Sequence, residues 1–117
     1  MKVKVLFAAA VLAASFAAPA WADPSGTYSV DGTNPDGGAG YKGTVTVTKT
    51  GDTFKVDWTI GDHTVTGTAV GNDDLLSIGY SNGTQPGVGL YVKQDGKWKG
   101  VWSYLGQTSM GTESWSQ

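Results

Sequence analysis

The sequence has no cysteine and no arginine, and it has a single histidine and a single glutamate, His63 and Glu113. The absence of cysteine excludes disulfides, a lipid anchor on cysteine and thiolate metal ligands. Nucleic acids and anionic membrane surfaces both bind cationic patches, which an acidic chain without arginine does not offer. We therefore expect no nucleic acid and no membrane surface among its partners.

The scarcity of histidine and glutamate also argues against an enzyme. Nucleophilic catalysis needs a base that a third group orients, and the alternation of residues places His63 and Asp57 on opposite faces of the sheet. Glycoside hydrolysis needs two inward acids, whereas Glu113 is alone. Its strand has no defined register, so Glu113 is either a barrel-end acid bonded to tyrosine or backbone groups, or an exposed side chain. We expect no catalytic residues.

Metal and cofactor sites are not expected either. The acidic turns at 34–37 and 73–74 lack the spaced ligands and the closing glutamate of a calcium loop. The glycine-rich stretch at 37–40 lacks the lysine and the following helix of a phosphate-binding loop. The sequence therefore predicts neither a cofactor nor a bound metal.

The first 22 residues are typical of a secretory signal peptide. Lysines precede an almost wholly apolar run at 5–18, and Ala-Trp-Ala at 20–22 is a cleavage motif, which places the cut between Ala22 and Asp23. The apolar run is shorter than the roughly 20 residues of a membrane span. We expect an exported protein, periplasmic or secreted, with one small domain at 23–117. That domain has six lysines against ten acidic residues, a net charge of −4.

The stretch at 54–69, FKVDWTIGDHTVTGTA, predicts the hairpin around which the domain is organised. Apolar residues alternate with polar ones in both arms, which is the period of half-buried strands. A two-residue turn at Gly61-Asp62 would pair Trp58 with Val65 and Ile60 with His63. This register unites the apolar residues on one face, with His63 inward at a barrel end.

About eight short strands at a spacing of roughly ten residues follow from the same alternation, and no segment has helical periodicity. Tight connections between neighbours favour an antiparallel up-and-down meander barrel, with a β-sandwich as the alternative. An outer-membrane barrel is disfavoured because its outward faces would bring threonine, Lys55 and Asp57 into contact with lipid.

One hairpin, at 88–103, admits two registers. A two-residue turn at Asp95-Gly96 would separate the tryptophans from Leu90 and Val92. A three-residue turn would instead pair Val92 with Trp98 and unite the apolar sets. We therefore expect the three-residue turn.

Several segments resemble a family of small exported bacterial proteins: GTYSVDGTNPDG at 26–37, YKGTVTVTKTGDTFKVDWTIG at 41–61, DGKWKGVW at 95–102 and GTE at 111–113. The resemblance covers nearly all of 23–117. It implies an exported β-rich protein, and members are often described as fibronectin-binding. The expected architecture is also similar to calycin-like barrels, meaning lipocalins and avidin-like proteins, which carry small ligands.

The candidate ligand-binding residues are the aromatic side chains expected to face inward: Tyr41, Trp58, Tyr80, Trp98 and Trp102. They could line a pocket for an apolar or aromatic ligand. In so small a barrel we expect them to fill the interior instead.

The leading functional hypothesis is an exported, non-enzymatic binding or interaction module. Its partner, an extracellular or periplasmic protein, would meet the loops at 31–40 and 81–87 at the open end of the barrel. A carrier of a small apolar ligand is the first alternative. A periplasmic enzyme inhibitor is the second, since such inhibitors also use eight-stranded barrels.

Overall fold

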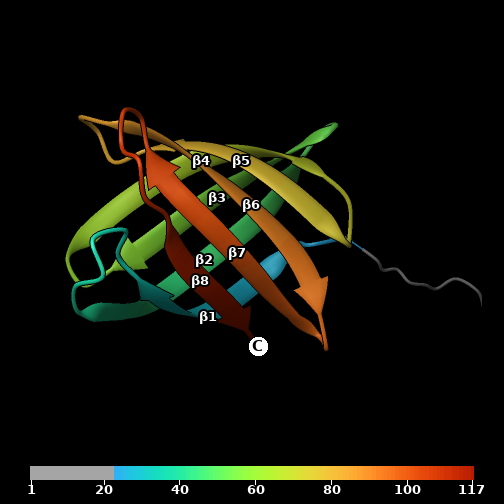
Figure 1. Cartoon of the computed structure of the whole chain (residues 1–117). Helices are drawn as coiled ribbons and strands as arrows, with labels where there is room; N and C mark the ends of the chain where they lie inside the picture. Colours follow the sequence, from blue (N-terminus) through green and yellow to red (C-terminus); the bar gives the residue numbers. More distant parts are fainter. Residues whose placement is uncertain (1–22) are drawn as a thin grey trace, which may run out of the picture.

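The computed structural model describes residues 23–117, which form a closed barrel of eight antiparallel strands (Figure 1). Each strand pairs with its neighbour in sequence, and the last strand pairs with the first. The strands are β1 (Gly26–Thr33), β2 (Gly40–Thr50), β3 (Thr53–Ile60), β4 (His63–Gly71), β5 (Leu75–Ser81), β6 (Pro86–Gln94), β7 (Lys97–Tyr104) and β8 (Gly111–Ser116).

The predicted up-and-down barrel is thus confirmed, and the sandwich alternative is wrong. The predicted signal peptide at 1–22, including Ala22 of the predicted cleavage site, lies outside the described residues; Asp23 is the first residue described. Among residues 23–117, no helix has the length and apolar character needed to cross a membrane.

Alternation decides which face of each strand is buried. In β2, Val45 and Val47 are buried while Thr44 and Thr48 are exposed. The β3–β4 hairpin has the predicted register, with Trp58 opposite Val65. Threonine and valine favour strands because a branched side chain packs well on a pleated surface.

The β6–β7 register was predicted wrongly. The turn has two residues, Asp95 and Gly96, and both have positive φ, 53° and 78°. This is the turn geometry that best matches the twist of a hairpin. Lys93 therefore lies opposite Trp98, and Tyr91 lies opposite Gly100. The apolar residues of the other face are left exposed: Val88, Leu90 and Val92.

Glycines explain why the aromatic face is the buried one. Gly100 lies directly opposite Tyr91, and a Cβ atom built on Gly100 would overlap the Tyr91 ring at Cγ, Cδ2 and Cε2. The Tyr91 side chain therefore occupies the space that any larger residue at position 100 would need. This complementarity outweighs the burial of three aliphatic residues on the other face.

Replacing Gly100 with alanine should lower the free energy of unfolding by about 2 kcal/mol, the usual cost of overpacking a core. The Tyr91 ring cannot swing aside easily, because the overlap extends to Cγ, only two bonds from the backbone Cα. Gly79→Ala is the matched control, since its Cβ would have no atom within 4 Å. Urea denaturation of both variants checks this prediction, and equal stability of the two would contradict it.

The barrel has one closed and one open end. At the closed end, Pro24 is buried and its carbonyl accepts a hydrogen bond of 2.7 Å from the Tyr28 hydroxyl. The open end, on the left of Figure 1, carries the loops at 34–39, 61–62, 82–85 and 105–110. Two of these are shorter than the loops predicted at 31–40 and 81–87, because strand pairing continues to Thr33 and resumes at Pro86.

Candidate functional site

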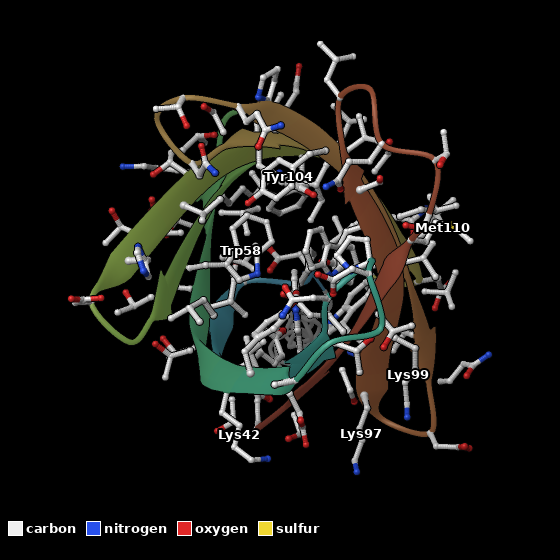
Figure 2. All side chains as sticks on the ribbon, turned by 60° about the vertical axis from the view of Figure 1, so that its left-hand side comes forward. Lys42, Trp58, Lys97, Lys99, Tyr104 and Met110 are labelled. Carbon is white, nitrogen blue, oxygen red and sulfur yellow. The ribbon has the colours of Figure 1, made fainter. Side chains whose placement is uncertain are left out.

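A cavity of about 350 Å³ opens between the loops of the open end. Figure 2 looks toward this end and shows Trp58 and Tyr104 inside the ring of strands. The expectation that side chains fill the whole barrel is therefore wrong for this half. The cavity is lined by Asn34, Tyr41, Trp58, Ile60, His63, Thr64, Val65, Tyr80, Asn82, Tyr91, Trp102, Tyr104 and Glu113.

Four of the five predicted ligand-binding residues lie on the cavity wall: Tyr41, Trp58, Tyr80 and Trp102. The fifth, Trp98, is completely buried and does not line the cavity. Its ring packs against Trp115, with 6.4 Å between the centroids. Trp98 is therefore a core residue, which is the role that the filled-barrel interpretation gave to all five.

Glu113 lies at the base of the cavity and is only 8 % exposed. Its carboxylate accepts four hydrogen bonds from side chains. Oε1 accepts from Trp58 Nε1 at 3.1 Å, from the Tyr91 hydroxyl at 2.8 Å and from Trp115 Nε1 at 2.8 Å. Oε2 accepts from the Tyr41 hydroxyl at 2.6 Å. All four groups donate, which is the pattern of an ionised carboxylate.

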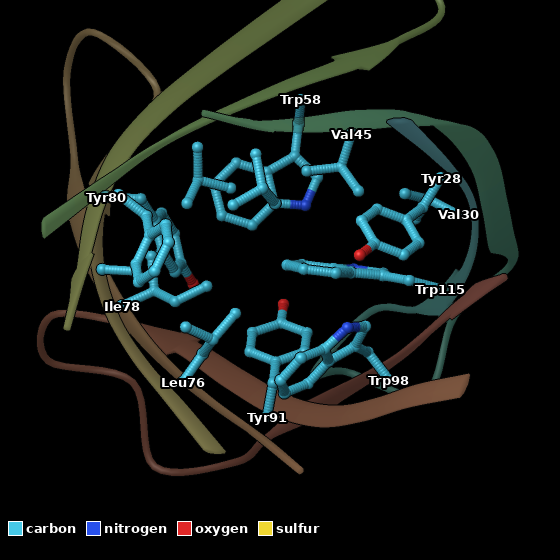
Figure 3. Packing of buried hydrophobic residues seen from close by; sticks show 14 of the residues in the cluster. Tyr28, Val30, Val45, Trp58, Leu76, Ile78, Tyr80, Tyr91, Trp98 and Trp115 are labelled. Carbon is cyan, nitrogen blue, oxygen red and sulfur yellow. The ribbon is translucent and has the colours of Figure 1, made fainter. Parts of the chain in front are cut away.

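The donors come from four strands and converge on the barrel axis. In Figure 3, Trp58 and Tyr91 point inward from opposite walls, and the Trp115 ring lies between them. Their packing fixes the donor positions: the Tyr91 and Trp115 rings are 4.5 Å apart, and the Trp58 and Trp115 rings 6.1 Å apart. The carboxylate is therefore held rigidly.

Two glycines make room for this network. Glu113 lies opposite Gly32 on β1 and opposite Gly100 on β7. A Cβ atom on Gly32 would overlap the Tyr41 ring, as one on Gly100 would overlap that of Tyr91. Each glycine, because it has no side chain, therefore leaves room for the ring of one tyrosine whose hydroxyl bonds to Glu113.

The environment of the tyrosines reflects burial and a nearby negative charge. Burial raises the pKa of Tyr91 well above its ordinary value, and the Glu113 carboxylate raises it further. The same two causes, in the same order, raise the pKa of Tyr41. Burial is also the main cause of the raised pKa of Tyr80, whose hydroxyl donates to the Ser103 carbonyl at 2.9 Å. These phenols therefore remain neutral donors at neutral pH.

No lysine or histidine balances the charge of Glu113 among residues 23–117. The ion pairs found there lie on the surface, between Lys42 and Asp31, Lys55 and Asp57, and His63 and Asp62. All six lysines of the described part of the chain are exposed. Neutral hydrogen-bond donors alone stabilise the buried carboxylate.

His63 is at the rim of the cavity rather than inside it. Its side chain is 85 % exposed, and its Nε2 lies 3.6 Å from Asp62 Oδ1. Asp57 faces outward as predicted and accepts a hydrogen bond from Thr66 at 3.0 Å. The two side chains are not brought together. The described residues also contain no cluster of three or more metal-ligating side chains.

Sequence reasoning missed Tyr91, Trp115 and Tyr104, and it left Glu113 undecided. Tyr91 was missed because the β6–β7 register was wrong. A signal was present: Gly32 and Gly100 flank Glu113 on the neighbouring strands, and glycine inside a strand often marks a close approach of another group.

Among the described residues, two indole N–H groups, those of Trp98 and Trp102, are buried without a hydrogen-bond partner.

Two comparisons with known proteins, by family model and by sequence, give no match for this chain. No model of a known protein family matches it. No curated protein matches it in sequence either. The fibronectin-binding description therefore gains no support, whereas the closed eight-stranded antiparallel barrel is consistent with a calycin-like architecture.

Proposed function

We propose that this chain is an exported, non-enzymatic barrel that binds a small ligand with an apolar or aromatic body. The observation that carries the proposal is the cavity of about 350 Å³ at the open end, which has several aromatic side chains in its walls, polar side chains such as Asn34 and Asn82 in its lining, and one carboxylate, Glu113, at its base. Small-molecule sites commonly combine a concave apolar surface with a few fixed polar groups.

The wall side chains are held in place by contacts with one another and with Glu113. Trp58 is held by its bond to Glu113 and by an edge contact with Tyr80, whose ring lies 5.5 Å away. Tyr104 makes a similar contact with Trp102 at 5.6 Å. Ligand binding would therefore lose little side-chain entropy, which favours affinity.

A protein partner, including an enzyme that the barrel would inhibit, is the second proposal. The observation in its favour is that Leu105 and Met110, in the loop at 105–110, are 75 % and 64 % exposed. Both lie at the open end, where large exposed apolar side chains can contact a protein.

Tryptophan fluorescence tests the ligand proposal. A panel of small aromatic compounds should include some that shift or quench the emission saturably, because Trp58 and Trp102 line the cavity. Val65 also lines the cavity, so Val65→Phe should weaken binding of these compounds at least about tenfold by filling part of the space.

Val70→Phe is the matched control, because Val70 is on the same strand and is exposed. It should leave binding unchanged. A panel without any saturable response, or equal weakening by both variants, would overturn the ligand proposal.

A further inference from the structure

We propose that the ligand is an organic cation: a small amine or ammonium compound whose charged nitrogen bonds to Glu113 and whose apolar body contacts the aromatic walls. This inference rests on the proposed function and names the class of ligand. Neither the sequence nor the comparisons assign a ligand to this cavity.

The first argument is the number of acceptor positions on the carboxylate. Each carboxylate oxygen has two lone pairs. Oε1 already accepts three hydrogen bonds, whereas Oε2 accepts only one, from Tyr41. Glu113 lines the cavity, so a ligand that reaches the base meets a group with acceptor capacity left on Oε2. The complementary group on the ligand is a hydrogen-bond donor.

The second argument is charge. The described residues place no cation beside Glu113, and their ion pairs lie on the surface. A buried charge without a counter-ion is costly, and neutral donors offset that cost only in part. A cationic donor forms a shorter and stronger bond to a carboxylate than a neutral donor does. An anionic ligand would be repelled.

The third argument separates an organic cation from a metal ion. Calcium and magnesium need six or more oxygen ligands. The cavity has one carboxylate, Glu113, its other oxygen-bearing side chains are neutral, and the described residues contain no group of three or more His, Cys, Asp or Glu side chains that could hold a metal ion. Aromatic rings instead attract ammonium groups through their negative faces and cover an apolar body well.

The fourth argument is the charge around the mouth. The four loops of the open end carry Asp36 and Asp62 and no lysine. The opposite end carries charges of both signs, with Lys93 and Lys97 beside the turn at 95–96 and Asp52, Asp73, Asp74 and Asp95 in its turns. The described chain has a net charge of −4. The two aspartates and the absence of lysine in the loops of the mouth favour the approach of a cation over that of an anion.

Three probes of nearly equal size test the inference: phenethylamine, phenethyl alcohol and phenylacetate. Titration of the wild-type protein at neutral pH should show the amine binding at least about tenfold more tightly than the alcohol, and the acid most weakly. Glu113→Gln should bring the amine and alcohol affinities close together. Tyr41→Phe removes the only donor to Oε2 and should keep the preference for the amine.

A second measurement uses the wild-type protein and does not depend on the stability of any variant. The indole N–H groups of Trp58 and Trp115 donate to Glu113, so the amine should shift both of their NMR resonances. The Trp98 N–H does not bond to Glu113 and should not move. A shift of Trp98 alone, or of none, would overturn the inference.

The outcomes separate this inference from the proposed function. Equal binding of amine and alcohol that Val65→Phe weakens would overturn the organic cation and leave the ligand-binding function standing. An amine preference that survives in Glu113→Gln would also overturn the contact with Glu113. If no probe binds and the fluorescence panel is also silent, both proposals fall.

Discussion

Replacing Glu113 with leucine should lower the free energy of unfolding by about 4 kcal/mol, because it leaves buried donors without an acceptor. Trp58, Tyr91 and Trp115 are buried and donate to Oε1. Each stranded donor costs about 1–3 kcal/mol. The Tyr41 hydroxyl adds less, since Tyr41 is only partly buried at the cavity and can bond to water there.

An opposing effect makes this prediction informative. Leucine removes a buried charge, and replacing buried charges with apolar groups is often neutral or stabilising when all partners are replaced together. Here the four donors remain, so the loss of their acceptor should dominate. Urea denaturation measures the result.

Asp31→Leu is the matched control for Glu113→Leu. Asp31 is also a strand acid, but it is exposed and pairs with exposed Lys42 at 3.0 Å. An exposed pair contributes about 0–1 kcal/mol, so this variant should lose no more than that. If Glu113→Leu were as stable as Asp31→Leu, the cost of burying the Glu113 charge would equal the stabilisation that its hydrogen bonds provide, and the prediction would be wrong.

The second large effect is a loss of stability in alkali. Burial raises the pKa of Tyr28, Tyr41, Tyr80 and Tyr91 in the folded protein. Above pH about 10, the unfolded chain loses these phenol protons while the folded chain keeps them, so unfolding becomes easier as pH rises. Below pH 10 both states are protonated and the stabilisation is complete.

The expected slope is about 1.4 kcal/mol per pH unit for each tyrosine, and therefore about 5.6 kcal/mol per pH unit when all four contribute. Urea denaturation across alkaline pH measures the slope, and tyrosinate absorbance reports when the phenols ionise. Tyr91→Phe should reduce the slope by the contribution of one tyrosine, about 1.4 kcal/mol per pH unit. Ionisation of all tyrosines near pH 10 in the folded state would contradict the prediction.

Local patterns were sufficient to predict much of the fold. Alternation and the Gly61-Asp62 turn predicted the β3–β4 hairpin with its register. Tight turns between successive strands predicted the meander and its closure. These features depend on neighbours in sequence, which a single chain displays directly.

The features that the sequence did not predict correctly depend on how side chains of different strands fit together. The alternation in β6 favours burial of Val88, Leu90 and Val92, because the pattern reflects only the hydrophobicity of each side chain and not its fit against the next strand. The observed register depends on the fit of Tyr91 against Gly100, a property of two strands together. The position of Glu113 likewise depends on donors supplied by β2, β3, β6 and β8.

The Gly32–Tyr41 contact has a consequence for the size of the cavity. The ring of Tyr41 stands over a residue without a side chain, on the wall of the cavity. Shortening position 41 would therefore extend the binding space toward β1 without moving any backbone. A single substitution at position 41 would therefore change the volume of the cavity, while the hydrogen-bonded frame of strands stays as it is.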